Sequence, residues 1–196
     1  MKKVLVVIDY QKDFVDGALG FKKAETLEEG IYNKVKNYLN NGDKVVFTYD
    51  THYENYLDSR EGKSLPVPHC YMNTEGHELY GKLNEFVGVP NTFHYNKEAF
   101  GIAPKDMIKL SEEIGTELDE IELVGVVTNM RVISNVVTFQ AQYINANLIV
   151  DGSLCASFDN SLHNKALDVI EALSVKVISP DYSRHIKKPC FAWLKY

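Results

Sequence analysis

The stretch GVVTNMRVISN, residues Gly125–Asn135, decides the fold, because it reads as an apolar β-strand that runs directly into a helix. Strands that pass straight into helices are typical of βαβ units, which build parallel sheets. Arg131 falls in the first turn of the predicted helix, where a charged side chain needs a partner if it is buried. The role of this arginine is the first question that the sequence raises.

The same alternation of apolar runs and helical segments extends over most of the chain. Short runs rich in β-branched residues predict strands, and a period near 3.6 predicts helices between them. The strands are expected at residues 3–9, 44–50, within 91–97, and at 121–127, 146–151 and 175–178. The helices are expected at 26–39, 104–115, 129–143 and 159–173, the first opened by a capping box of Thr26 and Glu29. We predict one domain, residues 1–196, with a three-layer α/β fold around a doubly wound, mainly parallel six-stranded sheet.

Composition narrows the class of partner. The net charge of −6 and the scattered positions of the 21 basic residues argue against nucleic-acid binding, which needs clustered Lys and Arg. No stretch has the length of a membrane span, and the first apolar run is too short for a signal peptide. The three cysteines, Cys70, Cys155 and Cys190, have no metal-site or disulfide spacing and suit reduced thiols. We therefore expect a cytoplasmic protein with a small-molecule partner.

One connection is longer than a βα crossover requires. About 40 residues, 51–91, separate the second and third predicted strands, and connections of that length tend to be functional. A short helix is expected at residues 77–86, which leaves residues 51–75 irregular.

Polar side chains gather where the predicted strands end. Asp9 ends the first strand, Asp50 the second and Asp151 the fifth, while Lys97 follows the third and Arg131 the fourth. A single aspartate at such a place is as readily explained as a helix cap. Five such ends in one chain favour a ligand site at the carboxyl edge of the sheet.

Asp50 and three residues of the long connection that follows it form a candidate metal site. Asp50 and His52 are two apart on an extended segment and leave the same face, and His69 lies in the same long connection. Two imidazoles and a carboxylate are typical ligands of Zn²⁺, with Mn or Fe as alternatives, and Glu61 is the least certain fourth ligand. On spacing alone, ordinary loop residues remain the competing interpretation.

Five ordered motifs carry a resemblance that covers almost the whole chain. The sequence is similar to the isochorismatase-like hydrolases, and within them to the nicotinamidase branch. The motifs are VLVVIDYQKDFVDGALG, PHCYMNTEGHEL, NKEAFG, GVVTNMRVISN and DGSLCASFD. The resemblance implies a homo-oligomeric hydrolase of NAD salvage that converts nicotinamide to nicotinate and ammonia through a covalent intermediate on a cysteine.

The resemblance also assigns roles to individual residues. Asp9 and Lys97 match the catalytic acid and lysine, and the four candidate ligands match the metal site. Phe14 matches an aromatic residue that packs beside the pyridine ring, and Phe100, three residues after Lys97, is a second candidate for that contact, although core packing explains both equally well. The backbone N–H groups of Val127 and Arg131 are the expected oxyanion donors, on the reasoning that Thr128 caps the helix and leaves its first-turn N–H groups free. In relatives the peptide that matches Val126–Val127 is often cis.

The chain departs from the family at the position of the nucleophile, where it carries Arg131. A guanidinium stays protonated and cannot attack a carbonyl carbon. Cys155 is the nearest alternative thiol, with a packing role as the simpler interpretation. We expect Arg131 to point into the pocket and pair with Asp9, which would then be held ionised by two cations.

Three hypotheses follow from this departure. The first is a nicotinamidase-type amidohydrolase scaffold that is inactive as written. The second is a non-covalent isochorismatase-like hydrolase of an acidic vinyl ether, with Asp9 as acid and Arg131 as carboxylate anchor. The third is a non-enzymatic binding module on the same fold.

Overall fold

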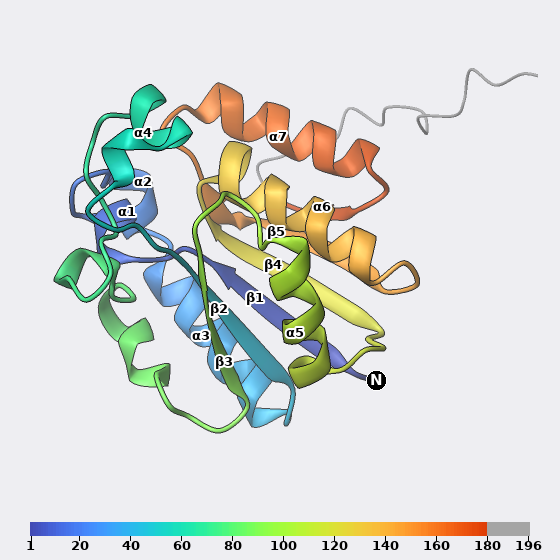
Figure 1. The fold of residues 1–196 in the computed structure, drawn as a ribbon. Helices are drawn as coiled ribbons and strands as arrows, with labels where there is room; N and C mark the ends of the chain where they lie inside the picture. Colours follow the sequence, from blue (N-terminus) through green and yellow to red (C-terminus); the bar gives the residue numbers. More distant parts are fainter. Residues whose placement is uncertain (180–196) are drawn as a thin grey trace, which may run out of the picture.

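The computed structural model describes residues 1–179. Within that range, six strands form one sheet in the order β3-β2-β1-β4-β5-β6, and every neighbouring pair is parallel (Figure 1). The predicted doubly wound sheet is therefore confirmed, and it is parallel throughout. The strands are β1 (Lys3–Ile8), β2 (Lys44–Asp50), β3 (Thr92–Lys97), β4 (Glu120–Val126), β5 (Asn147–Ala156) and β6 (Lys176–Ile178).

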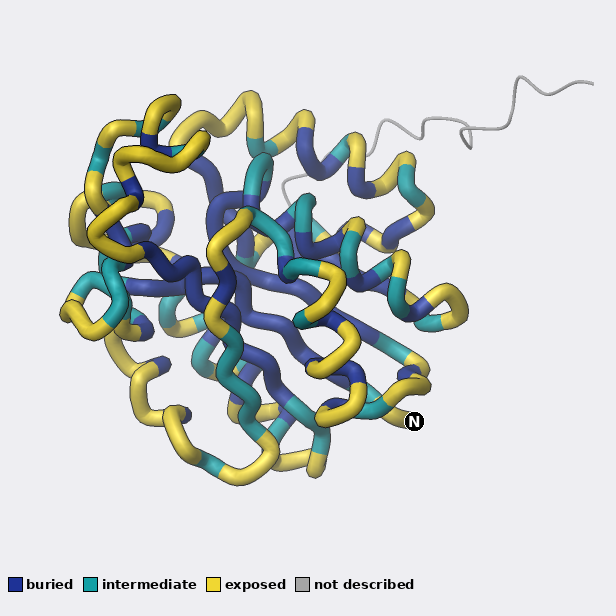
Figure 2. Tube along the Cα trace, in the orientation of Figure 1, coloured by how far each residue is buried: buried dark blue, intermediate teal, exposed yellow. Residues whose placement is uncertain are grey.

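Helices cover both faces of the sheet, so the fold has three layers (Figure 1). Alternation along β1 sends Val4, Val6 and Ile8 to one face and Leu5 and Val7 to the other. The first face packs against α5 (Pro104–Ile114), α6 (Ile133–Gln142) and α7 (Asn160–Ala172). The second packs against α1 (Lys12–Val15), α2 (Lys22–Glu25) and α3 (Glu28–Asn40). Figure 2 shows the central strands buried and the outer sides of the helices exposed.

The first long helix begins later than the sequence pattern indicates. α3 starts at Glu28, and Thr26 makes no capping bond to it, so the predicted capping box is wrong. Thr26 Oγ1 instead donates to the carbonyl of Lys23, because Thr26 ends the preceding short helix α2. The predicted end of the helix in the segment NNG is confirmed, since α3 stops at Asn40.

The long connection between β2 and β3 is more ordered than expected. It contains α4 (Arg60–Ser64) inside the stretch that was predicted to be irregular, and short 3₁₀ turns η1 (Tyr56–Asp58), η2 (Glu75–His77) and η3 (Gly81–Phe86). Ser59 caps α4, since its hydroxyl accepts from the N–H of Gly62 over 2.9 Å. The connection therefore presents Glu61 from a helix.

Two further sequence-based expectations concern the chain as a whole. Each helix in residues 1–179 is too short or too polar to serve as a transmembrane span. Cys70 and Cys155 are free and buried, and Cys190 lies outside the described residues.

Candidate active site

The candidate site lies at the carboxyl edge of the sheet, where the strand order changes direction between β1 and β4. Parallel sheets bind ligands at such switch points because the segments that follow the two strands diverge there. β1 is followed by Asp9, whose φ of 45° lies in the left-handed region that aspartate tolerates better than most residues. β4 is followed by the π-helical turn η4 (Thr128–Val132), which carries Arg131.

Asp9 and Lys97 form a buried ion pair at this edge. Lys97 Nζ donates to Asp9 Oδ2 over 2.5 Å and to the carbonyl of Ala99 over 3.1 Å. Thr48 Oγ1 donates to the other Asp9 oxygen over 2.5 Å. Asp9 is 0% exposed and Lys97 4% exposed, so the charge of Asp9 depends on these neighbours rather than on water.

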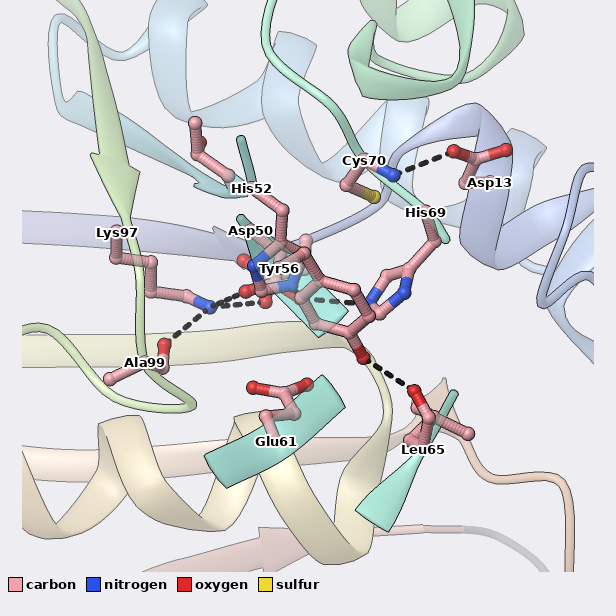
Figure 3. Close-up of polar contacts among 12 residues, drawn as sticks. Asp13, Asp50, His52, Tyr56, Glu61, Leu65, His69, Cys70, Lys97 and Ala99 are labelled. Atoms are coloured by element: carbon pink, nitrogen blue, oxygen red, sulfur yellow. Dashed lines mark hydrogen bonds and ion pairs between the residues drawn. The ribbon is translucent and has the colours of Figure 1, made fainter. Parts of the chain in front are cut away.

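The four predicted metal ligands converge, as Figure 3 shows for the labelled Asp50, His52, His69 and Glu61. One ligand atom from each lies within 4.8 Å of the others. Asp50 Oδ2 is 3.3 Å from His52 Nε2 and 3.5 Å from His69 Nε2. His69 Nδ1 is 2.8 Å from the carbonyl of Val67, a contact that fixes the proton on Nδ1 and leaves Nε2 with its lone pair toward the group.

Arg131 enters this group with its guanidinium, although the sequence argument paired it with Asp9. Its Nη2 donates to Asp50 Oδ2 over 2.6 Å and to Glu61 Oε1 over 3.2 Å, and lies 3.4 Å from His69 Nε2. Its Nε donates to Asp50 Oδ2 over 3.1 Å. The expected pair with Asp9 is present at 3.4 Å, but both nearest hydrogen bonds go to Asp50.

The donor set suits a divalent ion, but the arrangement that includes Arg131 does not. Zn²⁺ would need to lie about 2.0–2.2 Å from the same nitrogen and oxygen atoms. Nη2 of Arg131 already lies 2.6–3.4 Å from side-chain oxygen or nitrogen atoms of Asp50, Glu61 and His69. An ion bound to these three donors would occupy nearly the same volume, so metal and guanidinium exclude each other.

Burial and charge shift the pKa values of the two aspartates in opposite directions. Burial raises the pKa of Asp9, and the positive charges of Lys97 and Arg131, which lower this pKa, do not offset the effect of burial. Burial acts in the same sense on Asp50, but Lys97 and Arg131 hold the pKa of Asp50 well below its usual range. The hydrogen bonds of Arg131 go to Asp50, so Lys97 is the one cation that hydrogen-bonds Asp9, where two had been expected.

The backbone after β4 differs from the predicted oxyanion site. The N-cap of η4 is Val127 rather than Thr128, whose Oγ1 lies 2.8 Å from His163 Nδ1. The N–H groups of Met130 and Arg131 donate to the carbonyl of Val127 over 3.1 and 2.9 Å, since a π-turn gathers several donors on one carbonyl. The N–H of Arg131 is thus engaged within the chain. The Val126–Val127 peptide is cis.

The two predicted ring-contact residues are placed differently. Phe14 is 0% exposed and lies under the guanidinium of Arg131, whose Cζ is 4.2 Å from the ring centroid. Phe100 lies 5.2 Å from the same Cζ and lines a neighbouring cavity of about 760 Å³. The cavity also touches His52, Glu61 and Met130. The cavity reaches the outer side of the four candidate metal ligands, which we call the ligand group, while the guanidinium occupies the space between the rings of Phe14 and Phe100.

The thiols within the described residues do not supply a nucleophile. Cys155 is 1% exposed in the core and pairs with Gly125 across β5 and β4, and burial raises its pKa. Burial also raises the pKa of Cys70, whose N–H donates to Asp13 Oδ2 over 2.7 Å. Both are therefore thiols at neutral pH, as expected of packing residues.

Several residues of the site carry no signal that singles them out in the sequence. Tyr56, 2% exposed, places its ring 4.3 Å from that of His52 and 5.1 Å from that of His69. Gln11 bonds both backbone groups of Asp50, over 2.8 and 3.0 Å, and so fixes the end of β2. Only the position of Gln11, two residues after Asp9, hints at such a role.

Comparisons with known proteins agree with this architecture. The sequence matches the isochorismatase domain family over residues 3–181. A curated relative from Bacillus subtilis (strain 168), described as an uncharacterized isochorismatase family protein PncA, is 35% identical over 176 residues, 85% of this chain and 93% of that protein.

Solved structures show the same similarity. The nicotinamidase PncA of Bacillus subtilis is 28% identical with a TM-score of 0.78, over 91% of this chain and 100% of that one. The pyrazinamidase/nicotinamidase of Streptococcus mutans UA159 is 29% identical with a TM-score of 0.78, over 90% and 100%. The pyrazinamidase of Pyrococcus horikoshii, solved in complex with zinc, is 21% identical with a TM-score of 0.77, over 91% and 99%, a likeness of fold.

Proposed function

This chain belongs to the isochorismatase family, and on that premise we propose that it is a nicotinamidase-type scaffold that binds a small amide-like ligand but has lost the covalent step of amide hydrolysis. The ligand class is nicotinamide or a similar small amide, by analogy with the nicotinamidases from Bacillus subtilis and Streptococcus mutans. The family supplies hydrolase chemistry, and position 131 decides how much of it this chain retains.

The observation that carries the proposal is the state of Arg131. Its side chain is 1% exposed, stacks on Phe14 and donates to Asp50. By the family resemblance a thiol belongs here, and a guanidinium has no lone pair with which to attack a carbonyl carbon. The same side chain fills the space beside Phe14 where an aromatic substrate would stack.

Part of the catalytic apparatus remains. The buried Asp9–Lys97 pair is intact, with 2.5 Å between Lys97 Nζ and Asp9 Oδ2. A restored thiol at position 131 would lie near Lys97, whose charge favours a thiolate, and near Asp9, which can accept and return a proton. The cavity of about 760 Å³ beside Phe100 is within the size range of small-molecule sites.

Ammonia release from nicotinamide tests the proposal. The native chain, Arg131→Cys and Arg131→Ala are assayed side by side with zinc added. We expect Arg131→Cys to exceed the native rate at least a hundredfold, on the order of 3 kcal/mol of barrier and well within the contribution of one covalent nucleophile. Arg131→Ala opens the same space without a thiol and is the matched control, so it should stay near the native rate.

Three results would contradict the proposal, and each points elsewhere. Equal rates for Arg131→Cys and Arg131→Ala would show that a thiol at this position does not act as nucleophile. Hydrolysis of an acidic vinyl ether by the native chain would favour the non-covalent hydrolase. Saturable nicotinamide binding by Arg131→Cys with no turnover would favour a binding module.

A further inference from the structure

The geometry points to Arg131 as an internal cation that takes the place of the divalent metal ion, so that the native chain folds and binds ligands without a metal. This inference concerns what neutralises the ligand group and does not depend on whether amide hydrolysis can be restored. It rests on distances, charges and packing around one guanidinium nitrogen.

The distances place that nitrogen at the centre of the group. Nη2 lies 2.6 Å from Asp50 Oδ2, 3.2 Å from Glu61 Oε1 and 3.4 Å from His69 Nε2. Each of these three residues is also a candidate ligand of a metal ion. The guanidinium thus contacts three of the four candidate ligands, while His52 Nε2 has no hydrogen-bond partner among the described residues. Arg131 reproduces most, though not all, of the contacts of an ion.

Beside Lys97 the cluster takes one further cation, and a second one reverses the sign of its net charge. Asp9, Asp50 and Glu61 carry three formal negative charges when ionised, and Lys97 and Arg131 carry two positive charges. The native cluster therefore has a net formal charge of −1. A divalent ion in place of the guanidinium would make it neutral, whereas an ion added beside the guanidinium would make it +1. Two cations confined within a few ångströms in a buried site repel strongly, so the second is excluded.

Packing keeps the guanidinium from leaving. The side chain of Arg131 is 1% exposed and lies between Phe14 and Phe100, at 4.2 and 5.2 Å from the ring centroids. Its backbone is fixed as well, because its carbonyl accepts from Asn135 Nδ2 over 2.9 Å. To admit an ion, the chain would have to withdraw a charge from three acceptors and two aromatic faces, which is unfavourable.

Zinc titration of the native chain, followed by calorimetry and by metal analysis after dialysis, is the direct test. We expect less than about a tenth of an equivalent of zinc to be retained by the native chain. Arg131→Ala should retain close to one equivalent and bind zinc at least a hundredfold more tightly. Alanine adds no ligand atom of its own, so any gain comes from removal of the guanidinium.

Two variants separate this inference from a general effect of the substitution. Arg131→Lys keeps a cation in the pocket and should bind zinc much more weakly than Arg131→Ala. The double variant Arg131→Ala with His52→Ala should not retain the zinc that Arg131→Ala binds, because the second substitution removes one of the four candidate ligands of the ion. If Arg131→Ala is unfolded without metal, the recovery of its far-ultraviolet circular dichroism as zinc is added reports the same binding.

The inference is overturned by either of two results. One is retention of a full equivalent of zinc by the native chain with submicromolar affinity. The other is equal zinc affinity in the native chain and in Arg131→Ala, whatever the activity of either protein.

Discussion

Replacement of Arg131 by methionine measures how much the internal cation stabilises the fold. Methionine keeps much of the length and the apolar contact with Phe14 but removes the charge and both hydrogen bonds to Asp50. Asp50 is 0% exposed and would keep Lys97, whose Nζ is 3.5 Å from Oδ1, and the imidazoles of His52 and His69 at 3.3 and 3.5 Å from Oδ2. Removing one partner from a buried ion pair costs about 3–5 kcal/mol, because the remaining charge is left without compensation. Since Lys97 stays, the expected loss is near the lower end, about 3 kcal/mol.

Urea denaturation followed by circular dichroism, without metal and at pH 7, measures this loss. For a chain of this length it corresponds to a fall in Tm of about 6–12 °C, at roughly 2–4 °C per kcal/mol. The matched control is Arg131→Met combined with Asp50→Asn, in which both charges are gone. The double variant should recover part of the loss, which is the signature of direct coupling. A cost below about 1 kcal/mol for Arg131→Met, or simple additivity with Asp50→Asn, would refute the role given to this ion pair.

Two further predictions concern side chains outside the site. Lys34→Met should lower the free energy of unfolding by about 2 kcal/mol, because the substitution leaves the carboxylates of Glu122 and Asp151 without their shared lysine. The cost is smaller than for a fully buried ion pair because the side chain of Lys34 is 21% exposed. Burial lowers the pKa of Lys34, but its hydrogen bonds to Asp151 and Glu122 raise that pKa above the ordinary value of 10.5. The stability that Lys34 contributes is therefore complete below pH 10.5 and is lost at more alkaline pH. Urea titrations at pH 8 and 11 would detect this loss. Burial lowers the pKa of His94 below 6.5, so the folded chain gains stability above that pH and loses it as the pH falls. His94→Gln should therefore weaken the decline in unfolding free energy between pH 7 and 5, and an unchanged slope would contradict this assignment.

The sheet could be predicted from the sequence because its four inner strands, β2, β1, β4 and β5, are largely buried on both faces. The run KVVFTYD, for example, coincides with β2, Lys44–Asp50. The exceptions occur where tertiary pairing overrides local signals. The sequence predicts that the fifth strand ends at Asp151, where a turn-like Asp-Gly pair begins, yet β5 continues to Ala156. A register shift in the β4–β5 pairing lets Cys155 pair with Gly125, and no local pattern encodes that irregularity.

The site was predictable to the level of which residues meet. Parallel strands bring their carboxyl ends together, so the sequence places Asp9, Asp50, Lys97 and Arg131 at one edge without further information. The choice that Arg131 makes between the two aspartates depends on the side-chain rotamer. Its guanidinium rests on Phe14 and reaches Asp50 at 2.6 Å, while Asp9 remains at 3.4 Å. A difference of less than 1 Å, set by packing, is beyond any pattern of residue types.

The position of residue 131 explains why one substitution can alter both the nucleophile and the cation of this site. The first turn after β4 points its side chain into the space shared by Asp9 and Asp50, so a short thiol there would lie beside the ligand group, whereas a long cation passes into it. Once a guanidinium neutralises Asp50 and Glu61, these residues stabilise the fold as ion-pair partners even without a metal. Their presence in the sequence is then no evidence that a metal is bound. The amide hydrolysis and the metal binding that we propose for the scaffold are therefore linked through Arg131, and a variant with a small residue at this position should change both.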